Sequence, residues 1–155
     1  MMKNKIAVLF KIANLFNENG ITWNVDASCM LYLKDVVEDF NDIDLMIHIN
    51  DVEKVKEVLK KYKNLERKSN EKYQTEHFLE YHIEGVDIDI MAGFKIVHND
   101  NVHYFPLLRE QKSDKKIINN SIIYLESIEK GLIYYKLMER KDKVEIINNS
   151  LKVEH

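Results

Sequence analysis

Two short apolar stretches of the chain, residues 41–47 and 86–91, each carry a pair of aspartates: Asp42 with Asp44, and Asp87 with Asp89. Both stretches are rich in Ile and Val and lack a helical stripe, so we predict that they are strands. Residues two apart on a strand point to the same face, which places the two acids of each pair about 6 to 7 Å apart at their Cα atoms. Aspartate is depleted in strands, so the pairs indicate a function.

Carboxylates on neighbouring strands would need a cation. If the two predicted strands lie side by side, three or four acids converge and repel one another strongly. Hard oxygen ligands of this kind suit Mg²⁺ or Mn²⁺. An EF-hand is excluded, because Met46 and Ile47 stand where that loop requires an oxygen ligand and a glycine. The histidines are scattered without zinc-ligand spacing.

The elements that position these acids follow from local patterns. A helical stripe over residues 4–18 ends at Asn19-Gly20, and residues 21–25 form a short strand. Asp26 or Ser28 can cap the short helix that follows, to about Leu33. After the first acidic strand, which we expect to end near Ile49, Asn50-Asp51 opens another helix.

The second half of the chain reads as strands followed by helices. Residues 62–72 make a loop or an irregular strand, and residues 75–83 and 86–91 form a hairpin around Glu84-Gly85. A further hairpin is predicted over residues 94–107, and residues 115–125 add a strand across Asn119-Asn120. Two helices cover residues 127–140 and the stretch to about 152. We expect an α+β fold, with a domain over 1–125 and C-terminal helices over 126–155 packed on it as one compact unit.

Bulk properties exclude several classes of protein. The 155 residues carry a net charge of −3, which gives no basic surplus for tight, nonspecific nucleic-acid binding. No stretch is apolar enough to span a membrane, and the N-terminus lacks a signal-peptide pattern. Cys29 is the one cysteine, lies in an apolar run, and is expected to be a buried, unreactive thiol. A reducing, cytoplasmic location follows as the expectation.

The order of these motifs resembles the nucleotidyltransferase superfamily of DNA polymerase β. The chain is most similar to small bacterial nucleotidyltransferase-like proteins, relatives of the aminoglycoside and lincosamide nucleotidyltransferases and of AbiEii-type toxins. Residues 23–28 stand where that family has an apolar strand ending in Gly-Ser. Asp42-Ile43-Asp44 stands at the metal-binding acid pair and residues 86–90 at the third acid, while residues 136–142 match the C-terminal helix motif. The resemblance covers most of the chain and implies a mixed β-sheet flanked by helices.

The resemblance also implies a chemistry. A nucleoside monophosphate would pass from a nucleoside triphosphate (NTP) to a hydroxyl of a small molecule, RNA or protein, by a Mg²⁺-dependent in-line displacement. Asp42 and Asp44 would hold the metals, and Asp89 would bind metal or act as general base; Asp87 shares its face and stays an alternative. Ala27 and Ser28 would hold the β- and γ-phosphates, and Lys136 and Arg140 would add positive charge. A partner protein or a homodimer is compatible with this family.

The chain departs from the family pattern at the turn. Ala27 stands in place of the family's glycine, and its Cβ disfavours positive φ. Asp26 adds a negative charge beside it. We therefore keep a second hypothesis: a weakened or inactive member that binds nucleotide as a regulator or acts as a toxin–antitoxin partner. Structural roles also stay open, with Ser28 as a helix cap and Lys136 and Arg140 as solvated side chains.

Overall fold

The computed structural model of the protein describes residues 2–69 and 74–153. The helices of this part are α1 (Met2–Glu18), α2 (Ala27–Leu33), the 3-10 helix η1 (Ile49–Asp51), α3 (Val52–Val58), α4 (Ile128–Leu137) and α5 (Lys141–Val153). The strands are β1 (Trp23–Asp26), β2 (Ile43–Ile47), β3 (Asn64–Arg67), β4 (His77–Ile83), β5 (Val86–Ala92), β6 (Phe94–His98), β7 (Asn101–Phe105), β8 (Asp114–Ile118) and β9 (Ser121–Leu125). None of these helices is long and apolar enough to cross a membrane.

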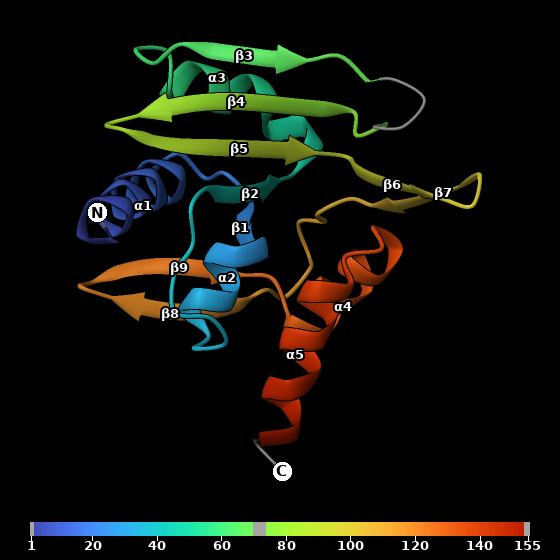
Figure 1. The fold of residues 1–155 in the computed structure, drawn as a ribbon. Coiled ribbons are helices and arrows are strands. Elements are labelled where there is room, and N and C mark those ends of the chain that lie inside the picture. The colour runs from blue at the N-terminus through green and yellow to red at the C-terminus, as the bar shows by residue number, and fades with distance from the viewer. Residues whose placement is uncertain (1, 70–73, 154–155) are drawn as a thin grey trace.

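A mixed sheet forms the frame of the molecule (Figure 1). Its strand order is β3-β4-β5-β2-β1-β9-β8, and β6 and β7 form a separate hairpin beside it. β2 runs parallel to β5 and β1 parallel to β9, whereas the remaining neighbours are antiparallel. The strand that carries Asp44 therefore lies directly beside the strand that carries Asp89. The predicted α+β fold with a mixed sheet is confirmed.

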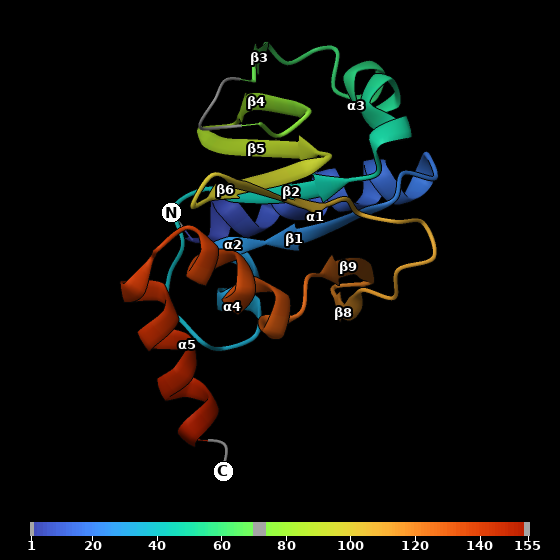
Figure 2. The ribbon, with the colours of Figure 1, turned by 90° about the vertical axis from the view of Figure 1, so that its right-hand side faces the viewer.

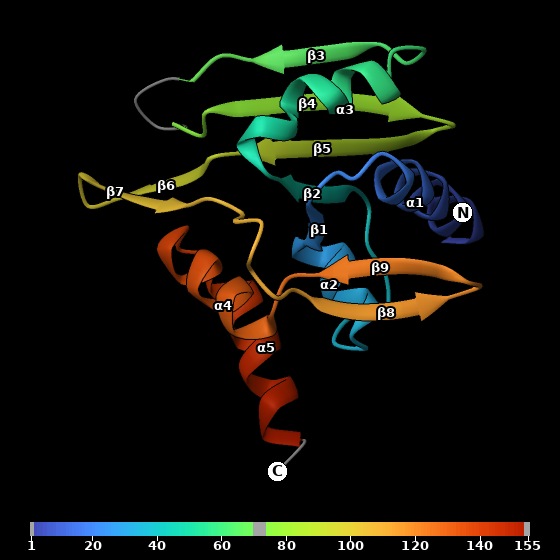
Figure 3. The ribbon, with the colours of Figure 1, turned by 180° about the vertical axis from the view of Figure 1, so that it is seen from behind.

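The core fills the face of the sheet covered by α1 and α3. α1 contacts β9, β5 and α3, and Figure 3 shows α3 crossing β4 on that side. Leu9, Ile12 and Phe16 of α1 are fully buried against strand residues such as Leu45 and Ile88. This burial, at about 25 cal/mol per Å² of apolar surface, fixes which strand residues face inward and leaves the alternate residues, the aspartates among them, on the other face.

α4, α5 and the β6–β7 hairpin lie at the end of the sheet where the acids stand. α4 packs against α5 and contacts β6, and Figure 2 shows α4 beneath β6. Ser127 caps α4 by accepting a hydrogen bond from the Lys130 amide at 3.1 Å. These elements add a polar and aromatic wall to a region that the sheet alone would leave open.

One predicted segment differs from the structure, and the structure decides between two alternatives for another. The single strand expected over residues 115–125 is two strands, β8 and β9, because Asn119 and Asn120 both have positive φ and make a hairpin turn. The segment 62–72 contains β3, which pairs with β4 and is fully exposed; residues 70–72 lie outside the described part. The Glu84-Gly85 turn is as predicted, with φ values of 49° and 83°.

Candidate active site

A row of carboxyl side chains crosses four strands of the sheet at one register. Asp26 on β1 is the partner of Asp44 on β2, Asp44 is the partner of Asp89 on β5, and Asp89 is the partner of Glu80 on β4. Partners in neighbouring strands point to the same face of a sheet. The fold thus brings Asp44 and Asp89 together, as the sequence predicted, and adds Asp26 and Glu80 to them.

The row holds more negative charge than its surroundings compensate. Burial, reinforced by the charges of Asp89, Asp26 and Asp42, raises the pKa of Asp44 to about 8. Burial likewise raises the pKa of Asp26 to about 7, and burial together with Glu80 raises that of Asp89 to about 6. Arg67 forms an ion pair with Glu80 and neutralises only the outer end of the row. A site with these properties would be stabilised by a cation.

The two remaining predicted acids lie at the margin. Asp42 is exposed and comes one residue before β2, so it is not within the strand that we predicted for it. Asp87 is exposed on β5 and pairs with His82 at 2.7 Å. Asp89 is partly buried and in register with Asp44, so the geometry favours Asp89 over Asp87 as the third acid. Its role stays a prediction.

The turn between β1 and α2 keeps the conformation that a glycine would favour. Ala27 has φ of 55°, in the left-handed region where a Cβ is costly. The Asp26 carboxylate accepts a hydrogen bond from the Ala27 amide at 2.7 Å and is the N-cap of α2, which decides between the two predicted caps. An amide that the sequence assigned to a phosphate is therefore bound by this neighbouring carboxylate.

A cavity of about 540 Å³ opens over the inner acids. Asp26, Asp42 and Asp44 line it together with Ala27 and Ser28. Neither Asp89 nor Asp87 is part of its wall. The cavity also has an aromatic wall, built from Phe40, Phe78, Phe94, Tyr134 and Tyr135. Phe94 and Tyr134 of this wall make an edge-to-face contact, with ring centroids 5.2 Å apart.

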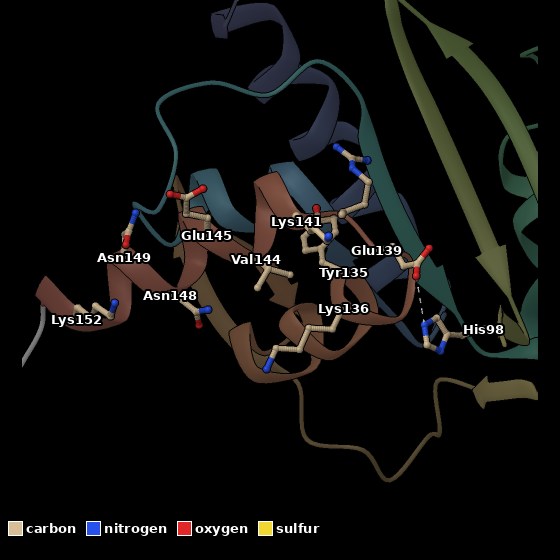
Figure 4. A pocket seen from close by; sticks show the side chains of 11 residues that line it. His98, Tyr135, Lys136, Glu139, Lys141, Val144, Glu145, Asn148, Asn149 and Lys152 are labelled. Atoms are coloured by element: carbon tan, nitrogen blue, oxygen red, sulfur yellow. Dashed lines mark ion pairs between the residues drawn. The ribbon is translucent and has the colours of Figure 1, made fainter.

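Two cations, Arg140 and Lys143, line the same cavity. The sequence predicted Arg140 as a source of positive charge for the triphosphate. Its side chain also forms an ion pair with Asp142 at 3.2 Å. Lys136 does not line this cavity. It lines a second one, of about 560 Å³, between α4 and α5, which shares Tyr135 and Arg140 with the first (Figure 4). The predicted contact of Lys136 with a triphosphate stays a prediction.

Sequence reasoning missed Glu80, Lys143 and the aromatic wall. Glu80 was within reach, because a two-residue turn at Glu84-Gly85 fixes the hairpin register and places Glu80 opposite Asp89. Lys143 lies in the first turn of α5, whose start has no capping pattern in the sequence. The sequence therefore does not indicate that Lys143 lies near the acids. The aromatic residues come from four separate regions of the chain, and only the tertiary fold gathers them.

Comparison with known proteins identifies the fold. No family model matches the chain, and no curated protein matches its sequence. Among solved structures, a proposed nucleotidyltransferase from Thermotoga maritima is similar, with a TM-score of 0.75 and 22% identity over 98% of this chain and 95% of that one. The antibiotic-resistance factor ANT(2'')-Ia has a TM-score of 0.67 and 13% identity over 99% of this chain and 88% of its own.

The lincomycin-bound lincosamide antibiotic adenylyltransferase LnuA is a third similar structure, with a TM-score of 0.61 and 16% identity. The match covers 90% of this chain and 94% of LnuA. The likeness to these structures covers 90% to 99% of the chain. At these identities it is a likeness of fold. The chain therefore has the nucleotidyltransferase fold.

Proposed function

We propose that the protein is a nucleotidyltransferase that moves a nucleoside monophosphate from an NTP to a hydroxyl of an acceptor. The observation that carries the proposal is the register of Asp44 with Asp89 beside a cavity that also holds Asp42 and Arg140. Support comes from the fold, since ANT(2'')-Ia has been solved with adenylyl-2''-tobramycin, an antibiotic that bears an adenylyl group. The acceptor of this chain can be a small molecule, an RNA or a protein.

The carboxyl groups suit Mg²⁺ as part of a substrate complex. Within the described residues, no group of three or more His, Cys, Asp or Glu side chains is arranged to hold a metal by itself. Magnesium is usually held by one or two carboxylates, with water and substrate phosphates completing the shell. Asp42 and Asp44 meet this requirement, and their repulsion would fall when a cation binds. Bound Mg²⁺ would neutralise phosphate charge that develops during transfer.

The chain's own residues would orient and neutralise the reactants. Arg140 and Lys143 supply positive charge to the cavity, and Phe94 and Tyr134 exclude water from one side of it. In the transfer, the acceptor oxygen bonds to the α-phosphorus while the bond to the α–β bridging oxygen breaks and pyrophosphate leaves. The hydroxyl proton would pass to a carboxylate, and Asp89 is our candidate because it is the partner of Asp44 in the parallel strand pair.

A second candidate function rests on the turn. Asp26 occupies the Ala27 amide and places a further carboxylate in the cavity, and both features oppose the binding of a triphosphate. A protein with this turn can retain the fold and bind nucleotide weakly, as a regulator or as one member of a toxin–antitoxin pair. This alternative predicts nucleotide binding without transfer.

Transfer of label from α-³²P-NTPs decides between the two. Each of the four NTPs is incubated with the protein, Mg²⁺ and fractionated cell extract, and labelled products are separated by size. The proposal expects one labelled class of product that requires both Mg²⁺ and Asp44, so the Asp44→Asn variant is the control. Nucleotide binding with no labelled product from any fraction would contradict the enzyme assignment.

A further inference from the structure

Tyr135 of α4 is a buried residue whose hydroxyl group has no partner in the described part of the protein. The residue is only 6% exposed. Its hydroxyl forms no hydrogen bond with any described residue, although buried polar groups are normally paired. The hydroxyl is not sealed inside the protein, because Asn24 Oδ1 is the one fully buried, unpaired side-chain atom among the described residues. It therefore opens into a cavity that Tyr135 lines.

The neighbouring tyrosine shows what a structural hydroxyl does in this helix. Tyr134 also lines the cavity over the acids, but its hydroxyl donates a hydrogen bond to the buried Glu126 carboxylate at 3.1 Å. Glu126 in turn accepts a hydrogen bond from the amide of Ser127 at 2.9 Å. The hydroxyl of Tyr134 thus fastens α4 to the residue that follows β9. The hydroxyl of Tyr135 makes no such contact, so packing of the fold does not explain it.

The charges around Tyr135 indicate that its hydroxyl faces the acids. Burial raises the pKa of this hydroxyl, and the negative charges of Asp26 and Asp44 raise it further. Asp26 and Asp44 line the cavity over the acids and not the second cavity. Figure 4 shows the side chains of Tyr135 and Lys136 leaving α4 in different directions, and only Tyr135 lines both cavities. The raised pKa keeps the hydroxyl protonated, so it can donate a hydrogen bond.

The end of α4 brings a cationic group to the same place. The Arg140 amide donates a hydrogen bond to the Tyr135 carbonyl at 2.9 Å, and Glu139 between them has φ of 57°, so the chain turns back on the helix. Arg140 also lines both cavities, and its charge lowers the pKa of Tyr135. Because the Arg140 side chain is paired with Asp142, its positive charge is partly compensated. An uncharged donor beside it therefore adds to what this side of the cavity can bind.

A phosphoryl oxygen is the ligand atom that suits these neighbours. It accepts hydrogen bonds without donating any, which fits the phenol of Tyr135, and its negative charge attracts Arg140. Next to Asp44 such an oxygen needs a cation between the two groups, and the Mg²⁺ of the proposed function is that cation. An amine would be attracted by the acids but repelled by Arg140.

We propose that the Tyr135 hydroxyl donates a hydrogen bond to a phosphoryl oxygen of the NTP, which makes Tyr135 a substrate-binding residue as well as a part of the aromatic wall. The inference rests on the proposed function, because it adds a contact to the donor site of the same reaction. It assigns different roles to adjacent tyrosines. Tyr134 holds α4 in place through its hydroxyl, and Tyr135 binds phosphate through its own.

Replacement of Tyr135 by phenylalanine removes the hydroxyl and keeps the ring. Calorimetry measures the affinity of the full chain for the Mg²⁺ complexes of ATP, GTP, CTP and UTP, and of inorganic tripolyphosphate, which has no base or sugar. Tyr135→Phe should weaken the binding of tripolyphosphate and of the preferred NTP by about tenfold each, the size expected for a lost hydrogen bond to a charged group. The melting temperature of the ligand-free variant should equal that of the wild type, since no hydrogen bond within the described residues is lost.

Two further tyrosines provide matched controls. Tyr124→Phe removes a hydroxyl on β9, outside both cavities, and should change the affinities by less than about twofold, because distant substitutions act independently. Tyr134→Phe leaves the buried Glu126 without its hydroxyl partner and should lower the melting temperature of the ligand-free protein. The two adjacent tyrosines should therefore differ in stability as well as in binding.

Several results would overturn the inference. The first is an unchanged affinity of Tyr135→Phe for the NTP and for tripolyphosphate. A loss confined to the NTP would assign the hydroxyl to the nucleoside and not to phosphate. In a transfer assay, Tyr135→Phe should raise the KM for the NTP, and a raised KM for the acceptor alone would assign the hydroxyl to the acceptor.

The proposed function is tested separately, by transfer of label from the NTPs. Weaker nucleotide binding by Tyr135→Phe, without any transfer by the wild type, would refute the proposed function and leave the phosphate contact standing. Transfer by the wild type, with unchanged nucleotide affinity in Tyr135→Phe, would refute the contact and leave the proposed function standing. Absence of nucleotide binding by the wild type would refute both.

Discussion

Asp44 on β2 and Asp89 on β5 are partners in a parallel strand pair, and their carboxyl groups project from the same face of the sheet. Asp26 extends this row on one side and Glu80 on the other. Such a row is unfavourable for the fold by itself, because buried like charges repel. The protein thus carries an electrostatic cost at the place where its fold would hold a nucleotide, as expected of a functional site.

The first prediction concerns stability and pH in the absence of divalent cations. The pKa of Asp44, about 8, and that of Asp26, about 7, lie above the ordinary value of 3.8. The folded protein therefore binds protons that the unfolded chain releases, and its stability should fall as the pH rises from about 4 to about 8. Urea denaturation with EDTA at pH 5 and pH 8 measures this.

Asp44→Asn should remove much of this loss and stabilise the metal-free protein at pH 8 by roughly 1 to 3 kcal/mol. Glu38→Gln, a change at an exposed carboxyl outside the cavity, is the control and should have no such effect. A wild-type stability that does not change between the two pH values would contradict the prediction.

The third acid can be identified by a matched pair of variants. Asp89→Asn should reduce pyrophosphate release by at least about 100-fold, because it removes a ligand or base beside Asp44. Asp87→Asn should stay within about threefold of the wild type, since Asp87 is exposed and paired with His82. Equal losses in the two variants would mean that the strand register does not determine the role.

The strained turn gives a prediction of opposite signs at two alanines. Ala27→Gly should stabilise the protein by about 1 kcal/mol, because glycine adopts a φ of 55° without the Cβ clash. Ala7→Gly, in the exposed interior of α1, should destabilise it by about 1 kcal/mol. Thermal unfolding compares the two, and a destabilising Ala27→Gly would show that the turn is not strained.

Two arginines allow the ion pair with a buried carboxylate to be compared with an exposed ion pair. Arg109 binds the buried Asp51 through two hydrogen bonds, at 2.9 and 3.1 Å, and Thr22 donates its amide to the same carboxylate. Arg109→Ala should cost about 2 to 3 kcal/mol, since it leaves a buried charge unpaired. Arg140→Ala, which breaks an exposed pair with Asp142, should cost less than about 1 kcal/mol.

The Asp51 carboxylate also makes the stability of the protein depend on pH in the acid range. Burial raises the pKa of Asp51, but the hydrogen bonds from Arg109 and Thr22 outweigh it and hold the pKa below its ordinary value. Its stabilising contribution is therefore complete above about pH 4 and is lost as the pH falls through the lowered pKa. Between pH 7 and acid pH, the free energy of unfolding should therefore fall less in the Arg109→Ala variant than in the wild type. An unchanged acid limb in this variant would contradict the assignment.

The sequence predicted the frame of this molecule well because the frame depends on local signals. Asn19-Gly20 ends α1, Glu84-Gly85 sets a hairpin, and the two acidic segments alternate as strands do. The pairing of β2 with β5 was only a condition in the sequence argument, and the fold satisfies it. The division of residues 115–125 into two strands was missed, because the apolar residues alternate only weakly there and the turn conformation of Asn119 and Asn120 was not predicted.

The sequence pointed to the acids of the candidate site and not to its walls, and the roles of these acids stay predictions. Asp44 and Asp89 were identifiable because aspartate is rare in strands. Phe94, Tyr134 and Lys143 meet the acids only through the packing of β6, α4 and α5, which no local pattern specifies. Lys136 and Arg140 are four residues apart and both line the second cavity, but Arg140 lies beyond the end of α4 and only Arg140 also lines the cavity over the acids.

Mg²⁺-dependent stabilisation by nucleotide is the most direct test of the central claim that Asp42 and Asp44 form part of a metal–triphosphate site. Thermal unfolding is followed with each NTP, with Mg²⁺ or EDTA, for the wild type and for the Asp42→Asn, Asp44→Asn double variant. The account predicts that an NTP raises the melting temperature of the wild type only when Mg²⁺ is present, and that the double variant shows no such increase. Stabilisation that is independent of Mg²⁺, or equal in the double variant, would contradict it.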